Sequence, residues 1–117
     1  MDKTTDNTTN ITDKANWDPT ANANSGNANT FTGTGLGFTI YDSTATKNTS
    51  WWGTGTTETD ANNKYAGFNT AATDIMEHQQ YSNTPTTTSV GYKLDVPATQ
   101  RSGAYDGAIT YSATTSP

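Results

Sequence analysis

Threonine dominates this chain of 117 residues, and its chemistry limits what the chain can fold into. There are 27 Thr residues, whereas Ile, Leu, Val and Phe together number 11. Thr is branched at Cβ, which disfavours helices and favours strands. The 12 aromatic residues supply apolar bulk that the aliphatic residues do not. The composition therefore predicts one small all-β domain with a thin, aromatic-rich core.

The charge pattern excludes several classes of function. The formal net charge is only −5, and a polar chain stays disordered mainly when its net charge is high. Six basic residues scattered among 11 acidic ones leave no basic surface for nucleic acid. Apolar runs are too short for membrane insertion. The absence of Cys excludes disulfides, thiolate zinc sites and thiol nucleophiles.

The composition also suggests a location. Few Lys and Arg, many Thr and Asn and no free thiol are typical of exported surface proteins, so we expect an extracellular or cell-surface protein. Met1-Asp2-Lys3 leads into Thr and Asn without the apolar stretch of a signal peptide. A signal or anchor is therefore expected outside this fragment.

The chain divides into a polar N-terminal segment, 1–30, and a β-sandwich domain, 31–117. Ile11 and Trp17 are the large apolar residues of the first part, apart from Met1. Residues 18–30 contain a low-complexity Ala-Asn tract and read as a linker. A first strand over 8–17 remains an open alternative.

Alternation of apolar and polar residues predicts the strands of the second part. It is clearest at 90–96, where Val, Tyr, Leu and Val alternate with Gly, Lys and Asp until Pro97 removes a ladder donor. A turn over 98–103 then leads to the last strand. Residues 71–80 fit either one helical turn, which Asp74 could cap, or a strand through Ile75. The expected strands are 36–41, 51–53, 65–69, 90–96 and 105–113, which suggest an antiparallel immunoglobulin-like sandwich.

The sequence SGAYDGAITYSAT at 102–114 resembles the closing strand of immunoglobulin-like domains in bacterial surface proteins, and 86–97 resembles their penultimate strand. Such modules occur in wall-associated, pilus-like and WxL-type proteins of Gram-positive and candidate-phylum bacteria. The resemblance over 86–115 implies a non-catalytic structural or adhesive module. It also implies structural roles for Gly103, Tyr105 and Pro97, in which Gly shapes the turn and the Tyr hydroxyl holds the loop.

Groups suited to catalysis or cofactor binding are scarce. The one His, His78, stands beside Glu77, and adjacent side chains project in different directions. No nucleophile motif accompanies it, so we predict neither an enzyme nor a cofactor. Asp60 and Asn62 are a weak candidate for a calcium site. The sixth and twelfth positions of such a loop hold Tyr and Ala instead of Gly and Glu, which favours a simple turn and no metal.

Aromatic residues provide the candidate contact site, made of Trp51, Trp52 and Tyr65. In a strand, two adjacent rings face opposite sides of the sheet. An exposed ring could stack on a cell-surface glycan or a protein partner. The alternative is that one ring lies in the core and the other packs under the loop 53–64.

The expected strands are fewer than the seven of an immunoglobulin-type sandwich. The missing strands come either from the N-terminal segment of the same chain or from a neighbouring subunit. The candidate donor strand is 3–12, around Ile11. Two other functions therefore stay open, a carbohydrate-binding module and the soluble head of a pilin that assembles into a filament. Asn7, Asn10 and Asn48 lie in glycosylation sequons.

Overall fold

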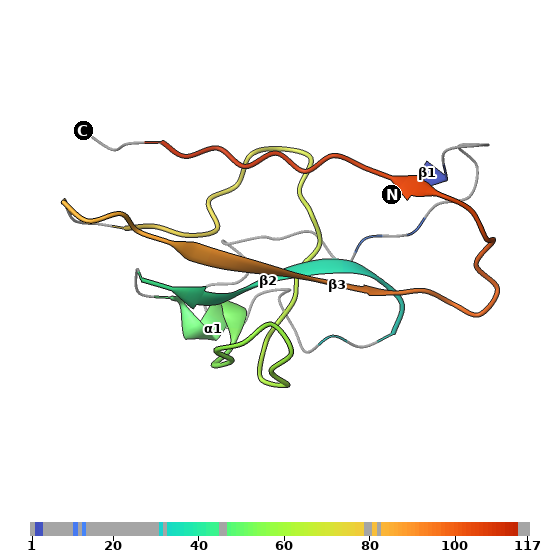
Figure 1. Ribbon diagram of the computed structural model, residues 1–117, viewed down its shortest axis with the longest axis horizontal. Coiled ribbons are helices and arrows are strands. Elements are labelled where there is room, and N and C mark those ends of the chain that lie inside the picture. Colours follow the sequence, from blue (N-terminus) through green and yellow to red (C-terminus); the bar gives the residue numbers. More distant parts are fainter. Residues whose placement is uncertain are drawn as a thin grey trace.

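The computed structural model describes residues 2–3, 11, 13, 31, 33–44, 47–78, 81 and 83–114. Its elements are β1 (Asp2–Lys3), β2 (Gly35–Ser43), α1 (Thr49–Trp52), β3 (Thr88–Asp95) and β4 (Tyr105–Asp106). Strand dominates, with an antiparallel sheet and little helix, which confirms the prediction of an all-β chain (Figure 1).

β2 and β3 form the main antiparallel pair. Leu36 lies opposite Leu94, Phe38 opposite Tyr92 and Ile40 opposite Val90, so these residues share one face of the sheet. The register shifts between Ile40 and Asp42, where the strand is irregular. The predicted strands 36–41 and 90–96 are thus present, within about one or two residues at their ends.

β2 is flanked on its other edge by the segment 65–67. The backbone N–H of Phe38 donates to the carbonyl of Ala66 at 2.9 Å, and the N–H of Ala66 donates back at 3.0 Å. Asp13 bridges to Leu36 in the parallel sense. β2 is therefore the central strand, which explains why most of its residues are buried.

The core is small and aromatic. It consists of the buried residues Phe38, Ile40, Trp52 and Ala66. The Phe38 ring lies 5.2 Å from the Trp52 ring and 5.0 Å from the Phe68 ring, measured between centroids. Aromatic contacts at these separations add to the stabilisation that burial supplies.

The predicted strand over 51–53 is wrong, because the Trp pair lies in the short helix α1. The side-chain oxygen of Asn48 accepts hydrogen bonds from the backbone N–H groups of Ser50 and Trp51, at 3.1 and 3.2 Å. The helix ends at Gly53, whose φ of 78° suits Gly. Capping at both ends therefore outweighs the strand preference of Trp.

The helical turn considered for 71–80 is absent from the described part of that range, 71–78. Asp74 caps no helix there. Ile75 and Met76 instead pack against the core from an irregular segment. Their apolar contacts are made without the backbone hydrogen bonds that a helical turn would add.

The predicted last strand, 105–113, is mostly wrong. Only Tyr105–Asp106 is a strand, and it pairs with β1 rather than with the predicted strand at 90–96. Residues 107–114 have no ladder partner among the described residues, and Figure 1 shows them running along the molecule above the β2–β3 sheet. Alternating side chains do not make a strand unless another backbone offers hydrogen bonds.

Most of the N-terminal segment lies outside the described residues, including the predicted linker 18–30 and most of the open first strand 8–17. Of the donor candidate, the structure describes Ile11 and the backbone of residue 3. In the described part of the chain, no helix has the length and apolar character needed to cross a membrane.

Candidate functional site

Two of the three candidate contact residues are buried. The Trp52 side chain is fully buried, and its indole N–H donates to the carbonyl of Ile75 at 3.2 Å. Tyr65 is also buried, and its hydroxyl donates to the carbonyl of Glu58 at 3.2 Å. Trp51 is half-buried against the core. Of these three candidate residues, only Trp51 therefore has part of its ring available for stacking on a sugar.

The loop 53–64 is held by a residue that the sequence analysis did not single out, Asn63. Its side chain is only 1% exposed, and its Nδ2 donates to the carbonyls of Thr57 and Glu58 at 2.8 and 3.2 Å. Gly55 lies directly against it, since a Cβ added there would come 2.1 Å from Asn63 Oδ1. Nothing in the sequence distinguishes Asn63 from its polar neighbours, so pattern reasoning could not find it.

Asp60 and Asn62, the weak metal candidate, form a turn. Asp60 Oδ1 accepts hydrogen bonds from the backbone N–H of Asn62 at 2.9 Å and from Asn62 Nδ2 at 3.0 Å. The amide of Asn62 thus presents its nitrogen, not its oxygen, to the carboxylate. The backbone hydrogen bond from Asn62 is the main cause that lowers the pKa of Asp60. Among the described residues, no group of three or more Asp, Glu or His could hold a metal ion.

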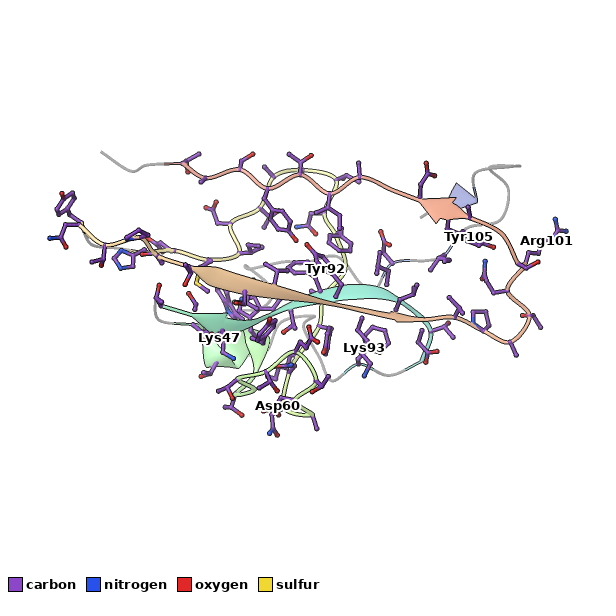
Figure 2. The ribbon with its side chains drawn as sticks, in the orientation of Figure 1. Lys47, Asp60, Tyr92, Lys93, Arg101 and Tyr105 are labelled. Carbon is purple, nitrogen blue, oxygen red and sulfur yellow. The ribbon has the colours of Figure 1, made fainter. Side chains whose placement is uncertain are left out.

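Lys47 connects this loop to β2. Its Nζ donates to the carbonyl of Tyr41 at 3.2 Å and to the carbonyl of Gly55. Partial burial lowers the pKa of Lys47, and the charges of Asp60 and Asp42 oppose this effect. Figure 2 shows Lys47 and Asp60 together on the side of the sheet that carries α1. The site is suited to holding the loop in place.

Lys93 lies on the face of β3 opposite to Tyr92, as Figure 2 shows. Its Nζ is 5.1 Å from the centre of the Phe31 ring and 5.8 Å from that of Tyr65. The two rings meet edge to face at 5.3 Å. These cation–π contacts attach Phe31 to the sheet.

The three residues implied as structural lie in one turn. The Tyr105 hydroxyl donates to the carbonyl of Arg101 at 2.7 Å and accepts from Gln100 Nε2 at 2.7 Å. The Pro97 carbonyl accepts from the backbone N–H of Gln100 at 2.9 Å. Gly103 has a φ of 143°, which L side chains rarely adopt. Tyr105 therefore fastens the turn between β3 and β4.

An exposed apolar surface runs over β3 and the C-terminal segment. Tyr92 is 51% exposed, Leu94 47% and Val96 40%. Ile109 and Tyr111 in the C-terminal segment are 44% and 51% exposed. The hydroxyls of Tyr92 and Tyr111 share a hydrogen bond. Partial burial of the hydroxyl, followed by its hydrogen bond with Tyr92, raises the pKa of Tyr111.

The remaining predicted residues are not brought together. His78 and Glu77 are both exposed at the end of the irregular segment 71–78. Ile11, the centre of the candidate donor strand, is buried within its own chain with 7% exposure. Asn48, which lies in one of the glycosylation sequons, caps the N-terminus of α1.

Comparison of the chain with protein-family models, with curated proteins and with solved structures finds no match.

Proposed function

We propose that this chain is a non-catalytic structural module of an extracellular bacterial surface or pilus-like protein, and that its fold is an immunoglobulin-like sandwich. One observation carries the proposal, the hydrogen bond from the Tyr105 hydroxyl to the Arg101 carbonyl. Immunoglobulin-like domains characteristically fix a corner with a Tyr whose hydroxyl bonds to the backbone a few residues upstream. Tyr105 lies within the 86–115 stretch that resembles those domains.

The arrangement of the strands supports two layers. β2, β3 and the segment 65–67 supply one antiparallel sheet. The β1–β4 pair lies above it in Figure 1 and would begin the second layer. A sandwich needs this second layer to cover the apolar face of the first.

The structural function ranks above carbohydrate binding because of where the aromatic residues lie. Stacking on a sugar requires an exposed ring, and two of the three residues expected to stack, Trp52 and Tyr65, are buried. The rings and hydroxyls instead hold loops and turns, as at Tyr105 and Tyr65. The expected partners are neighbouring subunits of the same protein or other components of the cell surface.

Limited proteolysis of the Tyr105→Phe variant tests whether the Tyr105 hydroxyl holds the turn between β3 and β4. The variant keeps the ring and loses the hydroxyl, so we expect faster cleavage within 97–104 than in the unmodified chain. Tyr81→Phe is the matched control, because Tyr81 is 95% exposed. Equal cleavage rates in both variants would remove the main support for the proposed fold.

The location is tested by protease treatment of intact cells of the source organism, followed by mass spectrometry of the released peptides. We expect peptides of this chain to appear before those of a cytosolic marker protein. Recovery of the chain only after cell lysis would contradict an extracellular role.

A further inference from the structure

The outer edge of β3 has no backbone partner in the part of the chain that the structure describes. β2 pairs with one edge of β3, from Thr88 to Asp95, and no other described segment joins the ladder. Edge strands of this length offer a row of free N–H and C=O groups to another strand. Their side chains decide which strand fits.

The side chains of this edge are complementary to themselves. Tyr92, Leu94 and Val96 place exposed apolar groups on one face, whereas Lys93 and Asp95 place opposite charges on the other. In an antiparallel pair, directly opposed residues lie on the same face, and unlike charges opposite each other stabilise the pair. In a strand with a cation and an anion two residues apart, each charge can therefore pair with the opposite charge of a second copy of the same strand.

One register accomplishes this. When Leu94 lies opposite Leu94 of a second copy, each Lys93 lies opposite an Asp95, and each Tyr92 lies opposite a Val96. No other antiparallel register of β3 with its own copy brings Lys93 opposite Asp95. The symmetry is a two-fold axis through the Leu94 pair, which is the commonest symmetry of protein dimers. Pro97 lacks an N–H group and limits the ladder just beyond Val96.

We propose that the outer edge of β3 binds a second copy of this chain in this register, forming one continuous sheet across the dimer. The partner is thus the chain itself, and the contact consists of backbone hydrogen bonds, two Lys93–Asp95 ion pairs and a doubled apolar strip of Tyr92, Leu94 and Val96. This inference does not depend on the proposed surface location.

The contact is expected to be weak and reversible. The paired segment of each copy is short, and an interface of this kind buries less than the roughly 1,200 Å² of a standard-size interface. A dissociation constant on the order of micromolar to millimolar is therefore expected. Exposed ion pairs are screened by salt, so the dimer should dissociate further at high ionic strength.

Charge reversal at the two positions tests the register. In a dimer of the Lys93→Glu variant, each of the two ion pairs becomes a pair of opposed carboxylates. In a dimer of the Asp95→Lys variant, each becomes a pair of opposed ammonium groups. Each single variant should therefore be monomeric. An equimolar mixture of the two variants restores both ion pairs and should form a heterodimer of doubled mass. Lys64→Glu makes the same change of charge outside β3 and should dimerise like the unmodified chain.

Sedimentation equilibrium of the full chain, from micromolar to millimolar concentration, measures these states. Circular dichroism establishes that each variant is folded. A dimer of the unmodified chain, two monomeric single variants and a dimeric mixture are the expected results. A monomer of the unmodified chain at every concentration would overturn the proposal, as would a mixture that stays monomeric while the unmodified chain dimerises.

Discussion

Two regions of this chain carry similar amounts of apolar side chain and use them differently. In residues 35–68, Phe38, Ile40, Trp52 and Ala66 are buried together. In residues 90–111, Tyr92, Leu94 and Tyr111 stay about half exposed. Both regions contain a strand in which apolar and polar residues alternate, but α1 and the segment 65–68 cover the first. Among the described residues, the C-terminal segment covers the second only in part. Burial in a sheet therefore depends on the covering layer and not on the strand itself.

The largest effect is expected at Trp52 in the packed region. Trp52→Ala should destabilise the fold by about 3–5 kcal/mol, because it removes a fully buried ring from the core. Trp51→Ala, in the same helix but half-buried, should cost less than about half as much. Urea denaturation measures both. Equal losses would mean that the burial of the ring does not determine how much it stabilises the fold.

A truncated apolar residue in the exposed region provides the comparison with Trp52→Ala. Leu94→Ala should cost about 1 kcal/mol or less, because the side chain is 47% exposed already. A loss at Leu94 as large as that at Trp52 would show that the β3 face is covered in solution.

A glycine pair tests the close packing of the loop that covers the core. A Cβ at Gly53 would lie 1.9 Å from the carbonyl oxygen of Asn62, whereas a Cβ at Gly33 meets nothing within 4 Å. Both residues have positive φ, and Gly53, with a ψ of −177°, also lies in a region that is essentially restricted to Gly, where an Ala costs on the order of 1–3 kcal/mol. Gly53→Ala should cost about 1–3 kcal/mol more than Gly33→Ala, because its neighbours must move. Thermal unfolding of both variants measures the difference, and equal melting temperatures would contradict the packing described.

The same contrast explains what could be predicted from the sequence. The alternation at 36–41 and 90–96 predicts both strands of the main pair, since one face of β2 and of β3 is more apolar than the other. It also predicts a strand over 105–113, where only two residues form one. The order of side chains along a segment indicates which residues would share a face if the segment were a strand. Pairing also requires a backbone from elsewhere in the chain, which the local sequence does not reveal.

The candidate site was harder to predict than the strands. The signal for α1 was Asn48 as a helix cap, followed by Gly53, but a helix of four residues is too short to show a period. The sequence left open whether the Trp pair forms a contact surface or places one ring in the core, and Trp52 lies in the core. Tyr65, the third candidate for the contact surface, is also buried. Trp52 packs against Phe38 and bonds to Ile75, whereas Tyr65 bonds to the loop 53–64, in which Asn63 lies against Gly55.

A smaller effect is expected from the cap of α1. Asn48→Ala removes the acceptor for the N–H groups of Ser50 and Trp51 and should lower stability by about 1 kcal/mol. Asn48→Asp preserves the acceptor and should stay close to the unmodified chain. The melting temperatures of both variants decide this. A full loss in Asn48→Asp would show that capping is not the role of this side chain.

The smallest effect concerns pH and Asp60. Hydrogen bonds from Asn62 hold the pKa of Asp60 below its ordinary value of 3.8, so the charged form favours the folded state. This contribution is complete above the unfolded pKa and is lost as the pH falls through the lowered folded pKa. The melting temperature of Asp60→Asn should therefore approach that of the unmodified chain as the pH falls below about 4. A difference that stays constant over this range would mean that the carboxylate charge does not contribute.

Amide hydrogen exchange tests the difference between the two regions most directly. The N–H of Phe38 donates to the carbonyl of Ala66 and the N–H of Ala66 donates to the carbonyl of Phe38, so both amides should exchange only when the whole fold opens. The amides of 107–114 have no backbone acceptor among the described residues and should exchange close to the rate of an unfolded peptide. Protection of 107–114 equal to that of Phe38 and Ala66 would contradict the account, because it would place the C-terminal segment in a fully paired sheet.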